Sequence, residues 1–105
     1  MRIDCIIGKS FGTYVALQLS RDLKPGQQIL IGLPMAMPVV GPQLMQDLSS
    51  TNVPTWLVVN DEDPVVGEYD FGALANGNIH PPYIKNRNDH TYVEFSFYAD
   101  LLNSL

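Results

Sequence analysis

Short apolar runs alternate along this chain with stretches in which apolar residues recur every three or four positions. The first pattern predicts strands buried on both faces, and the second predicts amphipathic helices. Because the two patterns alternate, the chain predicts βαβ units and a parallel sheet. Four strands are expected, at Ile3 to Ile7, Gln28 to Leu33, Thr55 to Asn60 and Tyr83 to Asn86.

Helix-like stretches follow each of these strands. Lys24-Pro25-Gly26 ends the first of them, and Pro81-Pro82 prevents the last strand from beginning before Tyr83. The helices are expected at about Gly12 to Leu23, Pro42 to Leu48, Glu68 to Ala75 and Tyr92 to Leu102. Right-handed crossovers then predict a three-layer α/β sandwich, with helices on both faces of a four-stranded parallel sheet in sequential order. Its core is expected to include Leu23, Leu30, Trp56, Val58 and Leu101.

Length and charge narrow the function classes. The 105 residues suit one small domain, 1–105, and 11 acidic against 6 basic residues give a net charge of −5. That charge argues against nucleic acid or an anionic membrane as the main partner, because both attract basic surfaces. The chain has no membrane-length apolar segment, no signal-peptide pattern and a single cysteine, Cys5, so we expect a cytoplasmic protein without an internal disulfide.

The clearest motif is Gly8-Lys9-Ser10-Phe11-Gly12, which lies directly between the first predicted strand and the first predicted helix. It fits G-x-S-x-G, the nucleophile elbow, in which a sharp turn presents the serine hydroxyl above the sheet edge. The two glycines are expected because side chains there would collide with neighbouring backbone. The N–H of Phe11 at the helix start is the expected oxyanion donor. A phosphate-binding loop would need glycine where Ile3 stands, so that alternative is rejected.

Two further candidates follow later strands. The third strand ends in an acidic turn closed by Pro64, where Asp63 is the preferred acid and Asp61 the alternative. After the fourth strand comes His90, which we expect at the same sheet edge because parallel strands end together. His80 precedes the fourth strand, on the opposite edge, and is assigned no chemistry.

These segments resemble the second half of the α/β-hydrolase fold family, over nearly the whole chain. The resemblance is carried by three stretches: Ile6-Ile7-Gly8-Lys9-Ser10-Phe11-Gly12-Thr13, Val53-Pro54-Thr55 leading to Asp63-Pro64-Val65-Val66, and Asp89-His90. The order serine, acid, histidine is the order of that family. Asn60 stands where the family usually has the glycine of its G-x-x-D-P-x-V stretch. The resemblance implies a Ser10–Asp63–His90 triad, a small ester-like substrate, an acyl-enzyme, and no cofactor or metal.

The family's first half has no counterpart here. It would supply a loop with a second oxyanion donor and a strand beside the Ile3 to Ile7 strand. We therefore expect an exposed sheet edge, and three interpretations stay open: a fragment, a truncated reading frame, and a subunit that needs a partner. The partner would be a second copy, giving a homo-oligomer, or the missing N-terminal half, joined through that edge. The alternative function is a non-catalytic remnant or interaction module that keeps the fold. A lyase or haloperoxidase-like member of the same fold is a third option, because fold does not fix function.

Overall fold

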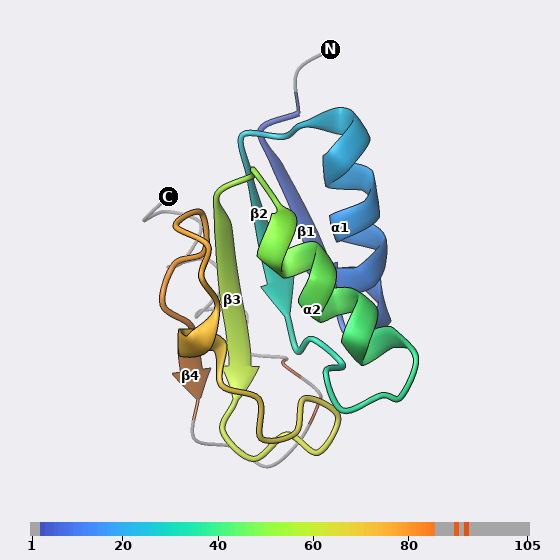
Figure 1. Ribbon diagram of the computed structural model, residues 1–105, viewed down its shortest axis with the longest axis vertical. Coiled ribbons are helices and arrows are strands. Elements are labelled where there is room, and N and C mark those ends of the chain that lie inside the picture. The colour runs from blue at the N-terminus through green and yellow to red at the C-terminus, as the bar shows by residue number, and fades with distance from the viewer. Residues whose placement is uncertain (1–2, 86–89, 91, 93–105) are drawn as a thin grey trace.

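The sheet has four strands, and all of them run in the same direction. The computed structural model describes residues 3–85, 90 and 92. The strands β1 (Cys5–Lys9), β2 (Gln27–Ile31), β3 (Thr55–Asn60) and β4 (Tyr83–Lys85) lie side by side in the order β1-β2-β3-β4 (Figure 1). Parallel pairing places Ile7 opposite Ile29 and Leu30 opposite Leu57. The predicted α/β class, strand order and direction are therefore confirmed.

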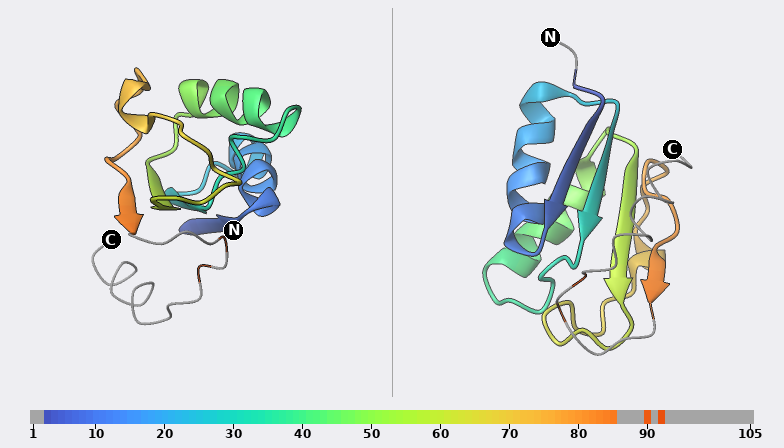
Figure 2. Two further views of the ribbon diagram at one scale, coloured as in Figure 1. Left: turned by 90° about the horizontal axis from the view of Figure 1, so that it is seen from below. Right: turned by 180° about the vertical axis from the view of Figure 1, so that it is seen from behind.

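The helices α1 (Phe11–Leu23) and α2 (Val40–Ser50) both cover one face of this sheet (Figure 2). Their buried leucines and alanine pack on the strand residues Leu30 and Leu57. A second, smaller cluster on the other face joins Ile29, Ile31 and Val58 to Tyr92. The third layer of the predicted sandwich stays a prediction. Its helix was expected at Tyr92 to Leu102, and within this range only Tyr92 is described, at a φ of 52° outside any helix.

The helix predicted at Glu68 to Ala75 is wrong, because the structure has only a 3₁₀ turn at Phe71–Ala73. Tyr69 and Phe71 both pack against the core cluster, and their ring centroids lie 4.9 Å apart. Residues two positions apart point to different sides of an α-helix. The core contacts of these two aromatic residues therefore favour an irregular segment.

Burial agrees with some of the core predictions. Leu30 and Val58 are fully buried, and Trp56 is partly buried. Leu23 was expected inside but is 48% exposed, and Leu101 lies outside the described residues. Leu23 ends a row of exposed apolar residues that recur at every fourth position of α1. This row consists of Phe11, Val15, Leu19 and Leu23. In the described part of the chain, no helix combines the length and apolarity needed to cross a membrane.

Candidate active site

Ser10 occupies a strained turn between β1 and α1. Its backbone has φ 56° and ψ −124°, a combination that side-chain-bearing residues rarely adopt. Such a conformation costs about 1–3 kcal/mol and persists only when the surrounding structure holds it. The N–H of Ser10 donates to the carbonyl of Ile31 over 2.8 Å, and the Ser10 carbonyl accepts hydrogen bonds from the N–H and hydroxyl of Thr13. These contacts fix the turn on both sides, as the elbow prediction requires.

The two glycines of the motif differ in what they do. A Cβ on Gly8 would lie 2.8 Å from the Cβ of Ala16 and closer still to the carbonyl oxygen of Gly12. Gly8 therefore lets β1 and α1 approach closely, as expected. A Cβ on Gly12 would meet nothing within 4 Å among the described residues. The collision predicted at Gly12 is therefore wrong for this part of the chain.

Phe11 is the first residue of α1. Among the described residues, no acceptor takes its N–H in a hydrogen bond. The N-terminal end of a helix also carries partial positive charge. The N–H of Phe11 therefore has no acceptor among the described residues and lies at the positive end of α1, next to Ser10 in the sequence, and its oxyanion role stays a prediction.

Asp63 lies in the loop after β3, and its side chain is buried with 2% of the residue exposed. The N–H of Val65 donates to Oδ1 of Asp63 over 2.8 Å, and the N–H of Gly67 donates to its carbonyl over 3.0 Å. Val66 of the same loop is buried in the main core cluster. The loop is therefore anchored in the core, and this anchoring fixes the carboxylate at the carboxyl end of the sheet.

His90 connects the serine to this carboxylate. Its Nδ1 lies 2.5 Å from Oδ2 of Asp63, and its Nε2 lies 2.7 Å from Oγ of Ser10. A carboxylate only accepts hydrogen bonds, so Nδ1 is the ring donor and Nε2 of the neutral ring is left to accept the proton of Ser10. The His90 side chain is 24% exposed, so the ring that contacts Ser10 is partly accessible from solvent.

Several hydrogen bonds keep the Asp63 carboxyl ionised. Burial alone would raise its pKa, but hydrogen bonds from His90, Tyr92 and the N–H of Val65, together with the charge interaction with His90, outweigh burial and hold the pKa below its usual value. Hydrogen bonds to the charged form of a carboxylate favour that form. Asp63 is therefore an anion at neutral pH.

Two residues at this site were missed by the sequence interpretation. Tyr92 is buried and donates its hydroxyl to Oδ2 of Asp63 over 2.6 Å. Gly32, directly after β2, has φ 61°, and a Cβ there would lie 2.5 Å from Cε2 of Tyr92 and 3.1 Å from Cε1 of His90. A glycine at the end of an apolar strand is a known signal of close approach, so Gly32 was detectable. Tyr92 gave no comparable signal.

The rejected and alternative candidates lie elsewhere. Asp61 is exposed, and the preferred acid Asp63 is the one that contacts His90. His80 bonds through its N–H to the carbonyl of Thr55, at the start of β3, and its ring stacks on Trp56 with centroids 3.8 Å apart. His80 is therefore at the opposite end of the sheet from Ser10, as predicted.

A shallow apolar hollow lies beside Phe11, the residue that follows Ser10. It has a volume of about 240 Å³ and lies between the N-terminal ends of α1 and α2, lined by Phe11, Tyr14, Val39, Val40 and Gln43. Among the described residues, no group of three or more histidine, cysteine or acidic side chains is arranged to hold a metal ion. Cys5 is partly buried, and burial raises the pKa of its thiol, which favours the neutral form.

Comparisons of the chain with models of protein families, with curated proteins and with solved structures found no match. The geometry at the carboxyl end of the sheet is therefore the feature that points to a function.

Proposed function

We propose that this chain is a serine hydrolase of the α/β-hydrolase type, which cleaves ester-like bonds through an acyl-enzyme on Ser10. The observation that carries the proposal is the continuous set of contacts from Ser10 Oγ through the His90 ring to the buried Asp63 carboxylate. A serine, a base and a group that orients the base are the elements of nucleophilic catalysis by a triad. The strained backbone of Ser10 is a second support, because such strain is concentrated at functional sites.

In the first half of the proposed reaction, Ser10 Oγ attacks the carbonyl carbon of the ester while Nε2 of His90 takes the hydroxyl proton. The carbonyl oxygen becomes an oxyanion, which the N–H of Phe11 stabilises. Asp63 holds the ring in the orientation that leaves Nε2 free to accept, and its charge stabilises the imidazolium. The carbon–oxygen bond then breaks, and the alcohol leaves with the proton from His90.

In the second half, water takes the place of the alcohol. His90 removes a proton from the water as it attacks the acyl carbon, and the same oxyanion donor serves again. The ester bond to Ser10 breaks, Oγ recovers a proton from His90, and a carboxylic acid is released. Atoms and protons therefore balance without a cofactor.

The hollow beside Phe11 supports short acyl groups as first substrates. Its volume of about 240 Å³ is below the roughly 300–1,000 Å³ of pockets that hold drug-sized ligands. Its lining is mainly aromatic and aliphatic, so it suits an apolar group rather than a charged one. Acetyl and butyryl esters of p-nitrophenol are therefore the appropriate chromogenic probes.

The test is covalent labelling of the full chain with a fluorophosphonate, which phosphonylates an activated serine and releases fluoride. We expect one adduct, located on Ser10 by mass spectrometry of peptides. The variant Ser10→Ala should lose the adduct and reduce ester hydrolysis by about a thousandfold or more. Ser49→Ala removes an exposed hydroxyl on α2 and is the matched control. An adduct on another residue, hydrolysis that survives Ser10→Ala, or a folded chain that takes no label contradicts the proposal.

The alternative function, an interaction module, is supported by a different surface. We propose that the outer edge of β1 and the exposed row Phe11, Val15, Leu19 and Leu23 bind a second copy of this chain. In the described sheet β1 is an outer strand, and unpaired strand edges and apolar patches mark protein interfaces. Sedimentation of the chain with Leu19→Glu beside the wild type tests it. Wild-type self-association that Leu19→Glu abolishes supports a second copy, and a wild type that stays monomeric contradicts it.

A further inference from the structure

Tyr92 holds a central place in the polar cluster at the carboxyl end of the sheet. Its hydroxyl donates to Oδ2 of Asp63 over 2.6 Å and accepts the N–H of Asn60 over 2.9 Å. Asn60 is the last residue of β3, so the tyrosine hydroxyl connects the end of a core strand to the carboxylate in the following loop. Tyr92 itself is 6% exposed, and its ring packs in the cluster with Ile29, Ile31 and Val58.

The same atom of Asp63 receives two donors. Both the Tyr92 hydroxyl and Nδ1 of His90 point at Oδ2, while the N–H of Val65 occupies Oδ1. The N–H of Val65 holds Oδ1, and the hydroxyl of Tyr92, whose ring packs on the sheet, holds Oδ2. The carboxylate therefore cannot rotate freely about its side-chain bonds. The position of Oδ2 then determines the direction of the hydrogen bond from Nδ1 of His90. Because the imidazole ring is rigid, this also determines the direction in which Nε2 points toward Ser10.

The protein backbone makes room for this arrangement at one position. The rings of His90 and Tyr92 meet edge to face, with centroids 5.6 Å apart. Any Cβ on Gly32 would enter this pair, because it would lie 2.5 Å from Tyr92 Cε2 and 3.1 Å from His90 Cε1. The φ of 61° at Gly32 also belongs to the region where glycine is favoured. The absence of a side chain at Gly32 therefore allows the rings of Tyr92 and His90 to pack against each other.

We infer that Tyr92 is a positioning residue for the triad: its hydroxyl fixes Oδ2 of Asp63 so that His90 presents Nε2 to Ser10, and Gly32 provides the space for this contact. The inference rests on the proposed serine hydrolase function and adds a fourth side chain to it. Tyr92 acts through Asp63 and His90 and has no role with the substrate. Its loss should therefore lower kcat and leave KM unchanged.

The first experiment uses Tyr92→Phe, which keeps the ring beside Gly32 and removes only the hydroxyl. The variant leaves Oδ2 and the N–H of Asn60 each with one partner fewer. Because the variant loses a hydrogen bond at a buried polar group, we expect its kcat and its rate of fluorophosphonate labelling to fall by about tenfold to a hundredfold. The pKa of the Asp63 carboxyl should rise, because this carboxyl loses a donor that holds its pKa below the usual value, and ¹³C NMR of the carboxyl carbon over a pH series measures the change. A structural role alone would leave kcat unchanged in the folded variant.

Tyr69→Phe is the matched control, since Tyr69 belongs to the loop that carries Asp63 and its hydroxyl makes no hydrogen bond among the described residues. It should keep wild-type kcat and labelling rate. Gly32→Ala is the second variant, and it should reduce labelling because its Cβ displaces both rings. Gly77→Ala, where a Cβ meets nothing within 4 Å among the described residues, is its control and should label at the wild-type rate.

A measurement by NMR separates this inference from the proposed function, because it needs no turnover. In the ¹⁵N-labelled wild type, the Tyr92 hydroxyl proton and the His90 Nδ1 proton should exchange slowly with water. Tyr92→Phe should accelerate exchange of the Nδ1 proton by about tenfold or more, if one hydrogen bond is lost. Slow exchange in a wild type that takes no label would contradict the hydrolase and retain the positioning contact. Solvent-rate exchange of the wild-type hydroxyl proton, or a folded Tyr92→Phe chain with unchanged exchange and labelling, overturns the inference.

Discussion

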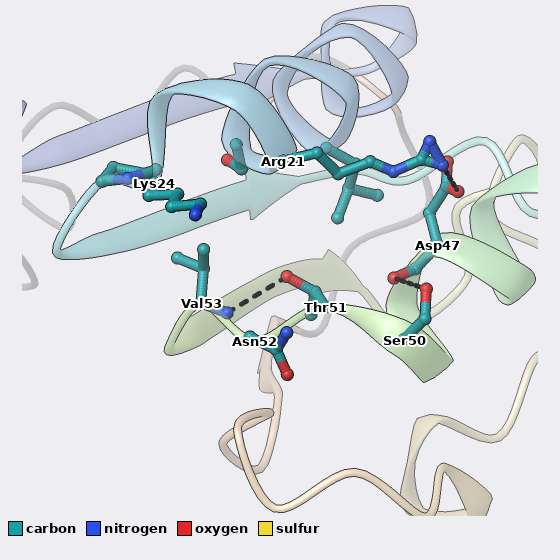
Figure 3. Close-up of a pocket in the computed structure, with 10 residues that line it drawn as sticks. Arg21, Lys24, Asp47, Ser50, Thr51, Asn52 and Val53 are labelled. Carbon is teal, nitrogen blue, oxygen red and sulfur yellow. Dashed lines mark hydrogen bonds and ion pairs between the residues drawn. The ribbon is translucent and has the colours of Figure 1, made fainter.

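Both ends of the sheet bury polar side chains, but they bury different kinds. At the amino end, the fully buried Gln28 accepts the hydroxyl of Ser20 over 2.7 Å and donates to Thr55 and Thr51 over 2.9 and 3.2 Å. A hollow of about 440 Å³ lies next to this network, between the C-terminal ends of α1 and α2 (Figure 3). It is larger than the hollow beside Phe11, although the candidate catalytic residues Ser10, Asp63 and His90 are at the carboxyl end.

Each end also contains a buried carboxylate. Asp47, at the amino end, accepts the side-chain amides of Gln18 and Gln43 and lies 3.6 Å from the guanidinium of Arg21 (Figure 3 shows the ion pair). None of these partners exchanges a proton near neutral pH. Asp63, at the carboxyl end, contacts a histidine, and histidine does exchange protons there. The chemical identity of the partners, rather than cavity size or burial, therefore distinguishes a structural network from a candidate catalytic one.

The largest expected effect comes from changing the acid at the carboxyl end. Asp63→Asn keeps the size of the side chain but removes its charge and favours the wrong tautomer of His90. We expect the rate of fluorophosphonate labelling to fall by about a thousandfold to ten-thousandfold, as for other triads. Asp61→Asn, at the exposed alternative acid, is the control and should keep the wild-type rate. Equal losses in both variants would contradict the assignment of Asp63.

At the amino end, a substitution should affect stability alone. Gln28→Leu removes the buried amide that joins Ser20, Thr51 and Thr55, and we expect the free energy of unfolding to fall by about 1–3 kcal/mol. Urea unfolding measures this loss, and Gln46→Leu on the exposed side of α2 is the control. The labelling rate of folded Gln28→Leu should match the wild type, and a large decrease would show that the two ends are coupled.

Acid should weaken the carboxyl end through Asp63. Its pKa is lowered in the folded chain, so its contribution to stability is fully present above the unfolded value of about 3.9 and is lost as pH falls through the folded value. Urea unfolding of the wild type and Asp63→Asn over a pH series measures this contribution. The difference between the two should shrink as pH falls below about 4. A difference that grows on acidification would contradict the sign.

The smallest effect concerns one non-glycine residue with positive φ from each end, Lys24 and Ser10. Lys24, at the C-terminal end of α1, has φ 46°, and Ser10 has φ 56°. Glycine relieves the strain at Lys24, and its greater freedom in the unfolded chain offsets part of this gain, so we expect Lys24→Gly to stabilise the fold by about 0.5–1 kcal/mol. Ser10→Gly gains the same relief but loses the hydrogen bond to His90, so we expect little net change in stability. Thermal unfolding measures both. Lys24→Gly should retain labelling and Ser10→Gly should lose it, so retained labelling in both would remove Ser10 as the nucleophile.

The sequence was sufficient for several features that depend on neighbouring residues. The strand at Thr55–Asn60 and the helix ending at Leu23 follow from local apolar patterns and from Lys24-Pro25-Gly26. The elbow is also local, because Gly8 and Ser10 belong to one strand-to-helix turn. Even the common edge of Ser10, Asp63 and His90 follows from the rule that parallel strands end together.

The tertiary structure decided the features that depend on distant residues. Whether Leu23 is buried depends on what packs beside α1, and an apolar helix position alone does not specify this. The choice of Asp63 over Asp61 became definite only when the His90 ring met Oδ2. The role of Tyr92 needed three segments at once, β3, the loop after it and Gly32, which meet only after folding. The sequence by itself determined which chemical groups are available, and the packing of distant segments determined which of them touch, because hydrogen bonds require contact within about 3 Å.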